Sequence, residues 1–186
     1  MKRFLIWSSL PLFFLLFGFA GLKVEYASAS GIETERIAGD TRIETAIEVS
    51  RKGWSESSTV ILARADDFPD SLVAVPLSHR LEAPILLTYP RELDNQVLNE
   101  IQRLGADQVI ILGSAQLMGD NITNVLDREE ISWERIGGTD RYETAVQVAG
   151  RLGATGQVIL ASGENFPDVL AISPYAGITE TPILLT

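Results

Sequence analysis

Residues 60–88 read VILARADDFPDSLVAVPLSHRLEAPILLT, and residues 158–186 read VILASGENFPDVLAISPYAGITETPILLT. The two stretches are identical at 15 of their 29 positions, which is far more than chance provides. Each begins and ends with a short, continuous apolar run, and a longer segment of helical period lies between them. Continuous apolar strands indicate burial on both faces, which is typical of a parallel sheet covered by helices. The stretch therefore predicts an α/β unit that occurs twice.

A second repeated stretch precedes each copy of the first. Residues 36–52 (RIAGDTRIETAIEVSRK) and 135–151 (RIGGTDRYETAVQVAGR) are identical at 8 of 17 positions. Thr41 stands three residues before Glu44, and Asp140 stands three residues before Glu143. This is the spacing of a capping box, in which the first side chain and the glutamate satisfy early helical N–H groups. Each unit is therefore predicted to begin with a capped helix.

The motifs D-F-P-D at 67–70 and N-F-P-D at 165–168 predict the start of a second helix in each unit. An Asx cap, a proline in the first turn and an acidic residue suit the exposed N–H groups and the positive end of a helix. We expect the first of these helices to reach about Arg80. We expect Phe68 and Phe166 to pack beneath the two helix starts as core residues.

The segment between the repeats completes the first unit. Its pattern predicts a helix at about 92–104, a buried strand at 109–113, a helix at about 115–126 and an edge strand at 133–136. The predicted fold class is α/β, with a short parallel sheet flanked by helices in an open three-layer arrangement like the flavodoxin and Rossmann folds. The second unit is expected to be truncated, because it stops after its second core strand.

The N-terminus has the pattern of an export signal. Lys2 and Arg3 precede an apolar run, and A-S-A at 27–29 is a small-residue cleavage site. The alternative is a permanent membrane anchor, because the run approaches the ~20 residues that a span needs. The predicted organisation is a signal peptide at 1–29, a first repeat at 30–134 and an incomplete second repeat at 135–186.

The chain is acidic and contains no cysteine, with a formal net charge of −10. Residues 1–29 carry three basic residues and one acidic residue, so a net charge of −12 remains for the rest. Nucleic acid and anionic lipid are therefore poor partners for it by bulk charge. An anionic polymer would have to bind through local arginine or lysine groups or through a bridging cation. An exported chain without disulfides suits a bacterial cell surface.

Residues with catalytic chemistry are few. His79 is the only histidine, and Gly177 stands at its position in the second repeat. Gly137 and Gly138 do not have the G-x-G-x-x-G spacing of a dinucleotide site, and the sequence has no phosphate-binding loop of the Walker type. The interpretation is a protein that is not an enzyme, with no catalytic residues, no cofactor and no metal. His79 is read as a surface or interface residue.

Arg42 and Arg141 occupy the first turn of the repeated helix, where the helix dipole disfavours a cation. A structural interpretation pairs Arg42 with Asp70 or Glu44, which would connect the first helix to the second. A functional interpretation has the guanidinium and the helix N–H groups bind an anion, such as a phosphate or carboxylate of a polymer. Recurrence does not separate the two, because a folding requirement repeats as faithfully as a binding site.

The acidic residues of the D-F-P-D region also allow two interpretations. They could hold a hard cation, which prefers oxygen ligands. Helix capping explains Asp67 and Asp70 without a metal, and the spacing is not that of an EF-hand loop, so capping is preferred. A separate hypothesis is a small-molecule-binding α/β domain, with a pocket lined by the loops at 64–67 and 162–165 at the ends of parallel strands.

The complete motif resembles the bacterial cell-wall-binding repeat 2 family. It runs R-[IY]-x-G-x-x-R-[IY]-E-T-A, V-I-L-A, [ND]-F-P-D-x-L and P-I-L-L-T, first from Arg36 to Thr88 and again from Arg135 to Thr186. The resemblance implies a surface protein held non-covalently on a Gram-positive wall, usually by three modules in a pseudo-threefold group. It also implies attachment to anionic secondary polymers, either teichoic-acid-like chains or secondary wall polysaccharides.

The leading hypothesis is a non-catalytic module that anchors an exported protein to the wall. The candidate polymer-binding residues are Arg42, Arg141, Asp70 and Asp168. We expect a secreted, cell-wall or cell-surface location, no membrane contact after signal cleavage and no nucleic acid. The alternative hypothesis is a modulator or enhancer of a peptidoglycan hydrolase such as an amidase, which would then be a further partner.

Overall fold

The computed structural model describes residues 33–153 and 155–186. Within them, Arg36–Thr186 forms one compact unit that contains both repeats. The predicted signal peptide at 1–29 lies outside the described residues. Among the described helices, none has the length and apolar character needed to cross a bilayer.

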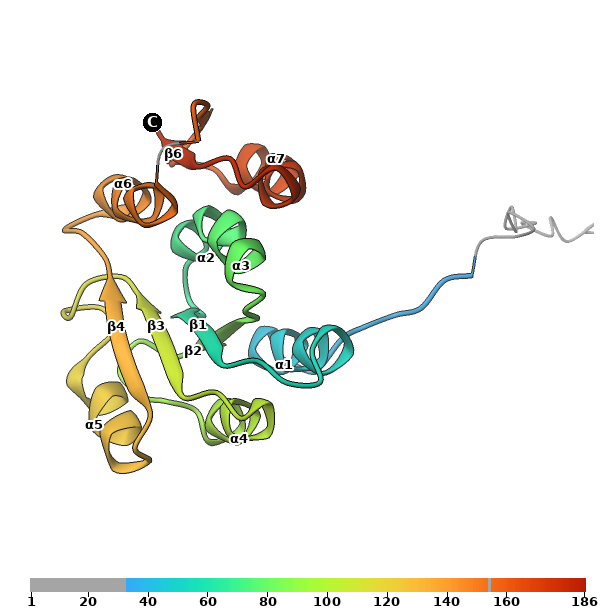
Figure 1. Ribbon diagram of the computed structural model, residues 1–186, viewed down its shortest axis with the longest axis vertical. Helices are drawn as coiled ribbons and strands as arrows, with labels where there is room; N and C mark the ends of the chain where they lie inside the picture. The colour runs from blue at the N-terminus through green and yellow to red at the C-terminus, as the bar shows by residue number, and fades with distance from the viewer. Residues whose placement is uncertain (1–32, 154) are drawn as a thin grey trace, which may run out of the picture. The chain divides into compact units, whose positions relative to one another are not determined.

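The first repeat forms a four-stranded parallel sheet (Figure 1). Its strands are β1 (Thr59–Arg64), β2 (Ile85–Thr88), β3 (Gln108–Leu112) and β4 (Ser132–Ile136), in the order β2-β1-β3-β4. In the register, Ile61 of β1 lies opposite Ile85 of β2 and Ile110 of β3. Val60, Ile61, Leu62 and Ala63 are fully buried, as expected for a central strand covered on both faces. The predicted α/β class and parallel sheet are confirmed.

Helices cover both faces of this sheet. One face packs against α1 (Arg42–Gly53), α4 (Asn95–Leu104) and α5 (Asp120–Arg128), and alternate strand residues such as Leu62 and Ile111 join that core. The other face packs against α2 (Pro69–Val73), α3 (Val75–Leu81) and α6 (Arg141–Leu152). The result is the expected three-layer arrangement, but α6 comes from the second repeat.

The second repeat continues directly from the first sheet. It contains α6, β5 (Ile159–Ala161), α7 (Phe166–Thr179) and β6 (Ile183–Leu185), and β5 and β6 pair in parallel. The predicted boundary between residues 134 and 135 falls inside β4, which hydrogen-bonds to β3. Helix α7 lies against α3, so the two repeats share one hydrophobic core (Figure 1).

The predicted helix caps are present at the start of both repeats. In α1, the Thr41 side chain accepts from Glu44 N at 3.2 Å, and a Glu44 carboxylate oxygen accepts from Thr41 N at 3.1 Å, which completes the capping box. In α6, Asp140 accepts from Glu143 N at 2.8 Å. Glu143 departs from the pattern, because its carboxylate accepts from the backbone N–H of Thr139.

The predicted Asx cap is wrong for α2, which begins after Phe68 rather than after Asp67. In α7, Asn165 is the N-cap residue and Asp168 lies in the first turn, as predicted, but the Asn165 side chain makes no cap hydrogen bond. The Asp67 carboxylate is used elsewhere, since one oxygen accepts from Phe68 N at 2.9 Å and the other contacts Arg141. The first of these helices is also interrupted at Ala74, between α2 and α3.

Two other predicted helices begin later than their sequence pattern indicates. Helix α4 starts at Asn95 because residues 89–94 form a turn, in which the Thr88 hydroxyl accepts from Asp94 N at 3.0 Å. Helix α5 starts at Asp120 after a turn in which the carbonyl of Ser114 accepts from Met118 N at 2.8 Å. Apolar residues in these turns stand at helical spacing from the helices that follow, so the sequence pattern placed the helix starts too early.

A buried carboxylate connects α1 to α4. Glu100 is 1% exposed, and it accepts from Ser50 Oγ at 2.7 Å and from two nitrogens of Arg103 at 2.8 Å. Burial alone would raise the pKa of this carboxyl, but the hydrogen bonds from Arg103 and Ser50 outweigh it and the pKa is lowered. Glu100 is therefore a charged structural group, and the sequence analysis did not identify it.

Candidate functional site

A small pocket lies at the carboxyl edge of the parallel sheet, beside β1 and β3. The chain leaves β1 toward β2 through α2 and α3 on one face, and it leaves β2 toward β3 through α4 on the other face. The strand order therefore reverses between β1 and β3, and ligands of open α/β sheets bind at such a switch point. The pocket measures about 190 Å³ and is lined by Arg64, Asp67, Pro69, Asp70, Leu117, Gly138, Asp140, Arg141 and Thr144.

We call this the switch-point pocket. Its residues come from the end of β1, the start of α2, the loop after β3 and the start of α6. Both repeats therefore contribute to it. Two of the four sequence-predicted candidates, Asp70 and Arg141, lie together in its lining.

Asp70 is the most unusual group of the switch-point pocket. It is 7% exposed, no hydrogen bond to its carboxylate is found among the described residues, and its oxygens reach solvent through the pocket. A Cβ placed on Gly113, just after β3, would come within 3.2 Å of an Asp70 oxygen, so the carboxylate lies against that backbone. Burial raises the pKa of Asp70, and the positive charge of Arg64 opposes the rise only in part.

The two arginines of the pocket are held by other partners. Arg64 makes two hydrogen bonds to Asp66, at 2.7 and 2.8 Å. Arg141 donates from Nη1 to the carbonyl of Gly163 at 2.6 Å, and its Nη2 lies 3.3 Å from Asp67. The Arg141 guanidinium also lies 6.0 Å from the ring centre of Phe68.

Arg42 repeats the local geometry of Arg141 but lies outside the switch-point pocket. It donates from Nη1 to the carbonyl of Ala65 at 2.7 Å, and Ala65 corresponds to Gly163 in the repeat. The predicted pairing of Arg42 with Asp70 or Glu44 is not found among the described residues. The guanidinium donates to the Ala65 carbonyl instead, and the Glu44 carboxylate accepts from backbone N–H groups at the helix start. The fourth candidate, Asp168, is exposed on α7 and does not line the pocket.

The aromatic residues of the two F-P-D motifs meet between the repeats. The rings of Phe68 and Phe166 lie 5.7 Å apart in an edge-to-face arrangement. Phe166 is 52% exposed, so its predicted place in the core is wrong. The residue instead extends the contact between α2 and α7.

The ion pair between Arg80 and Glu180 at the far end of the same interface was not predicted. Arg80 of α3 lies 2.8 Å from Glu180, which ends α7, and it also donates to the carbonyl of Leu152. His79 lies 3.6 Å from Glu180. The interface role expected for His79 is therefore observed. A signal was present in the sequence, because Arg80 and His79 differ from their repeat counterparts Ile178 and Gly177.

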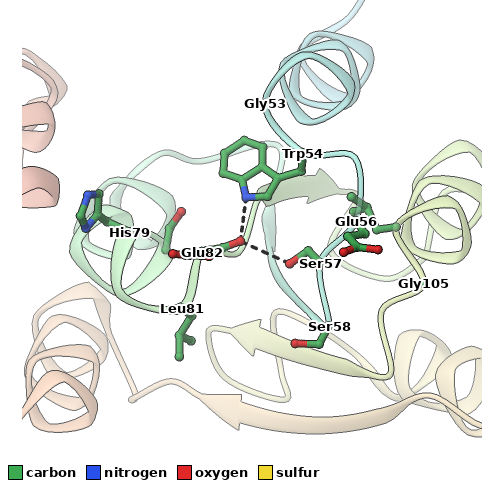
Figure 2. A pocket seen from close by; sticks show the side chains of 11 residues that line it. Gly53, Trp54, Glu56, Ser57, Ser58, His79, Leu81, Glu82 and Gly105 are labelled. Atoms are coloured by element: carbon green, nitrogen blue, oxygen red, sulfur yellow. Dashed lines mark hydrogen bonds between the residues drawn. The ribbon is translucent and has the colours of Figure 1, made fainter.

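A larger hollow of about 880 Å³ lies at the opposite, amino edge of the sheet (Figure 2). Trp54 and Ser57 converge there on the carbonyl of Glu82, with donor distances of 2.6 and 3.3 Å. These bonds hold together the loops that precede β1 and β2. Because the hollow is remote from the switch point and its donors are used within the fold, we place the candidate site at the smaller switch-point pocket.

A metal site has no support among the described residues. Within residues 33–153 and 155–186, no group of three or more His, Asp or Glu side chains is placed to hold an ion. Asp67 is engaged by Phe68 N and Arg141, and the loop at 162–165 contributes no lining residue to the switch-point pocket.

Comparison with known proteins gives a family match over both repeats. The model of the cell wall binding domain 2 (CWB2) family matches residues 36–123 and 135–186. The amidase enhancer of Bacillus subtilis (strain 168) is 37% identical over 153 residues, which is 82% of this chain and 22% of that protein. The N-acetylmuramoyl-L-alanine amidase LytC of the same organism is 32% identical over 152 residues, which is 82% of this chain and 31% of the enzyme.

A solved structure shows the same arrangement. Cwp8 from Clostridium difficile superimposes with a TM-score of 0.78 at 30% identity, over 83% of this chain and 28% of that chain. The present chain thus spans less than a third of each of these proteins.

Proposed function

The chain belongs to the cell wall binding domain 2 family, and from this premise we propose that it anchors an exported protein to a Gram-positive cell wall. The proposed ligand is an anionic secondary polymer, either teichoic-acid-like or a wall polysaccharide. The observation that carries the proposal is the family match over both repeats, in a chain that is also similar to an N-acetylmuramoyl-L-alanine amidase and to an amidase enhancer. We propose that residues 1–29 direct export and that the module itself is not catalytic.

The candidate contacts with the polymer remain Arg42, Arg141, Asp70 and Asp168. Asp70 and Arg141 would act together at the switch-point pocket, whereas Arg42 and Asp168 would contact the polymer from the exposed surface. Because the chain is acidic, binding to an anionic polymer would depend on such local groups and weaken as salt is added.

Wall retention tests this proposal directly. Residues 30–186 are incubated with purified walls and with the same walls after acid extraction of secondary polymers, and the bound fraction is measured after sedimentation. We expect retention on intact walls only. Equal retention on both preparations would contradict polymer binding, and an acidic protein of similar size without the repeats controls for trapping.

A second function is favoured by the relatives. The amidase enhancer and the amidase match this chain over the same repeated module, so the chain could bring a hydrolase to its substrate or increase its activity. Adding residues 30–186 to a cognate amidase should then speed the loss of turbidity of a wall suspension. An unchanged rate at saturating protein would rule this function out and leave anchoring in place.

A further inference from the structure

The switch-point pocket carries more negative than positive side chains, which disfavours the binding of an anion. Arg64 and Arg141 are the cations of its lining, and Asp67, Asp70 and Asp140 are the anions. Asp66, which is bound to Arg64, adds a fourth carboxylate beside the pocket. Two positive charges therefore face four negative ones, and both guanidinium groups already have protein partners. A phosphate or carboxylate would be repelled here.

The carboxylate of Asp70 lacks a donor among the described residues. The pocket leaves water as the donor to this largely buried carboxylate, and a ligand that supplies donors and positive charge can replace that water. Arg64 and Arg141 offer only partial electrostatic compensation, because Asp66 and Asp67 neutralise them. The missing partner is thus a group with several N–H donors and a positive charge, and a primary ammonium has three.

The pocket also limits the size of the ligand. A volume of about 190 Å³ leaves room for a small group such as one sugar ring or one aminoacyl group. The described residues provide no cluster that would hold a metal ion in its place. Thr144 and the backbone of Gly138 line the same pocket beside Arg141.

We propose that the switch-point pocket binds a primary ammonium group carried by the wall polymer, with Asp70 as its direct partner. The polymer then carries both charges, with its anionic groups outside the pocket and its amine inside. Two sources share this chemistry, an amino sugar without its acetyl group and an aminoacyl ester. This inference rests on the proposed wall binding for the identity of the ligand, but the pocket can be tested without walls.

The direct test uses glucosamine and N-acetylglucosamine as probes with residues 30–186, measured by titration calorimetry or by chemical-shift changes. We expect glucosamine to bind and N-acetylglucosamine to bind at least about tenfold more weakly, since acetylation removes the charge. Asp70→Asn should lose a similar factor. Its matched control is Asp107→Asn, which changes an exposed aspartate just before β3 and should bind as the unchanged chain does.

The pH dependence adds a second readout. The ammonium group binds the ionised form of Asp70, so affinity should fall as pH is lowered through the pKa of Asp70. Because burial raises that pKa, the loss should occur above the ordinary aspartate range near 3.9. The groups facing Asp70 are Arg64 from β1, Asp67 from the following loop, and Asp140 and Arg141 at the start of α6. Asp70→Asn should abolish this dependence.

Several outcomes would overturn the proposal. They are equal affinity for the two sugars, no binding of glucosamine, or unchanged glucosamine binding by Asp70→Asn. Thermal melting shows whether that variant is folded, and we expect it to melt no lower than the unchanged chain, because it removes a largely desolvated charge that has no protein donor. Tighter binding of inorganic phosphate than of glucosamine would also contradict the charge argument.

Wall preparations separate this inference from the proposed function. Acetic anhydride blocks every amine, whereas mild alkali removes only aminoacyl esters. If acetic anhydride abolishes retention of the protein and mild alkali does not, the ligand is an amino sugar. If both treatments abolish retention, the ligand is an aminoacyl ester. If Asp70→Asn and the unchanged chain are retained equally on intact walls, the result supports wall binding and contradicts the ammonium pocket. If the protein binds glucosamine but is not retained on walls, the result supports the ammonium pocket and contradicts wall anchoring.

Discussion

The two repeats carry the same arginine in two different surroundings. Arg42 and Arg141 each donate to the carbonyl of the second residue after the V-I-L-A strand motif, at 2.7 and 2.6 Å. Arg141 also contacts Asp67 and Phe68 of the other repeat. The shared contact is a local requirement of the module. The additional contacts arise because α6 packs on the sheet of the first repeat, and they connect the module to its neighbour.

A similar difference separates Ala38 from Gly137. The two residues occupy equivalent positions, but Gly137 lies directly after β4 and against the backbone of Gly113. A Cβ on Gly137 would come within 2.6 Å of the Gly113 Cα and closer still to its carbonyl group. Ala38 is exposed ahead of α1. Position 137 therefore requires glycine because two strand ends meet there.

The largest expected effect is that of Gly137→Ala. The added methyl group would collide with main-chain atoms, which cannot move as a side chain does, so we expect a loss of about 3 kcal/mol in the free energy of unfolding. Urea unfolding measures it. The matched control, Ala38→Gly, should change stability by less than about 1 kcal/mol. Similar losses of stability in Gly137→Ala and Ala38→Gly would contradict the claim that only position 137 requires glycine.

The arginines should differ by a smaller amount. Arg141→Ala removes a charged hydrogen bond, an ion pair and an aromatic contact, and we expect a loss of about 2 kcal/mol. Arg42→Ala removes the carbonyl contact alone and should cost about 1 kcal/mol. We also expect Arg42→Ala to reduce stability more than wall affinity. Normal melting with lost wall retention would show that the polymer contact of Arg42 outweighs its structural role.

The smallest expected effect concerns the two glutamates that end α3 and α7. Glu82 and Glu180 share a left-handed backbone conformation, with φ of 50° and 49°. Only Glu180 has an ion pair in the described part of the chain, with Arg80, and this hydrogen bond lowers the pKa of Glu180. Glu180→Gln should therefore lower the melting temperature slightly at low salt, whereas Glu82→Gln should leave it unchanged.

The sign of the pH effect follows from the lowered pKa of Glu180. The stabilisation is present above the ordinary glutamate pKa near 4.3 and is lost as pH falls through the lowered value. The difference between Glu180→Gln and the unchanged chain should therefore disappear in acid, and also in 1 M salt, where surface charges are screened. A difference that persists under both conditions would mean that Glu180 acts through packing.

Much of the fold follows from local patterns. The continuous apolar runs of β1, β2 and β3 and the caps of α1 and α6 are properties of short segments, and they were predicted correctly. The predicted starts of α4 and α5 were too early, because apolar residues in the preceding turns stand at helical spacing. The predicted Asx cap at Asp67 does not form, because one carboxylate oxygen accepts from Phe68 N and the other lies 3.3 Å from Arg141.

The sequence by itself determined the module, its repetition and its family, because strands, caps and motifs depend on neighbours along the chain. The tertiary structure decided which repeated residues act together. It places Asp70 beside Arg141 and leaves Arg42 and Asp168 apart from them, because the second repeat packs on one side of the first. Identical residues therefore differ in burial and charge environment. These properties depend on distances between segments that lie far apart in the sequence, which a pattern along the chain does not contain.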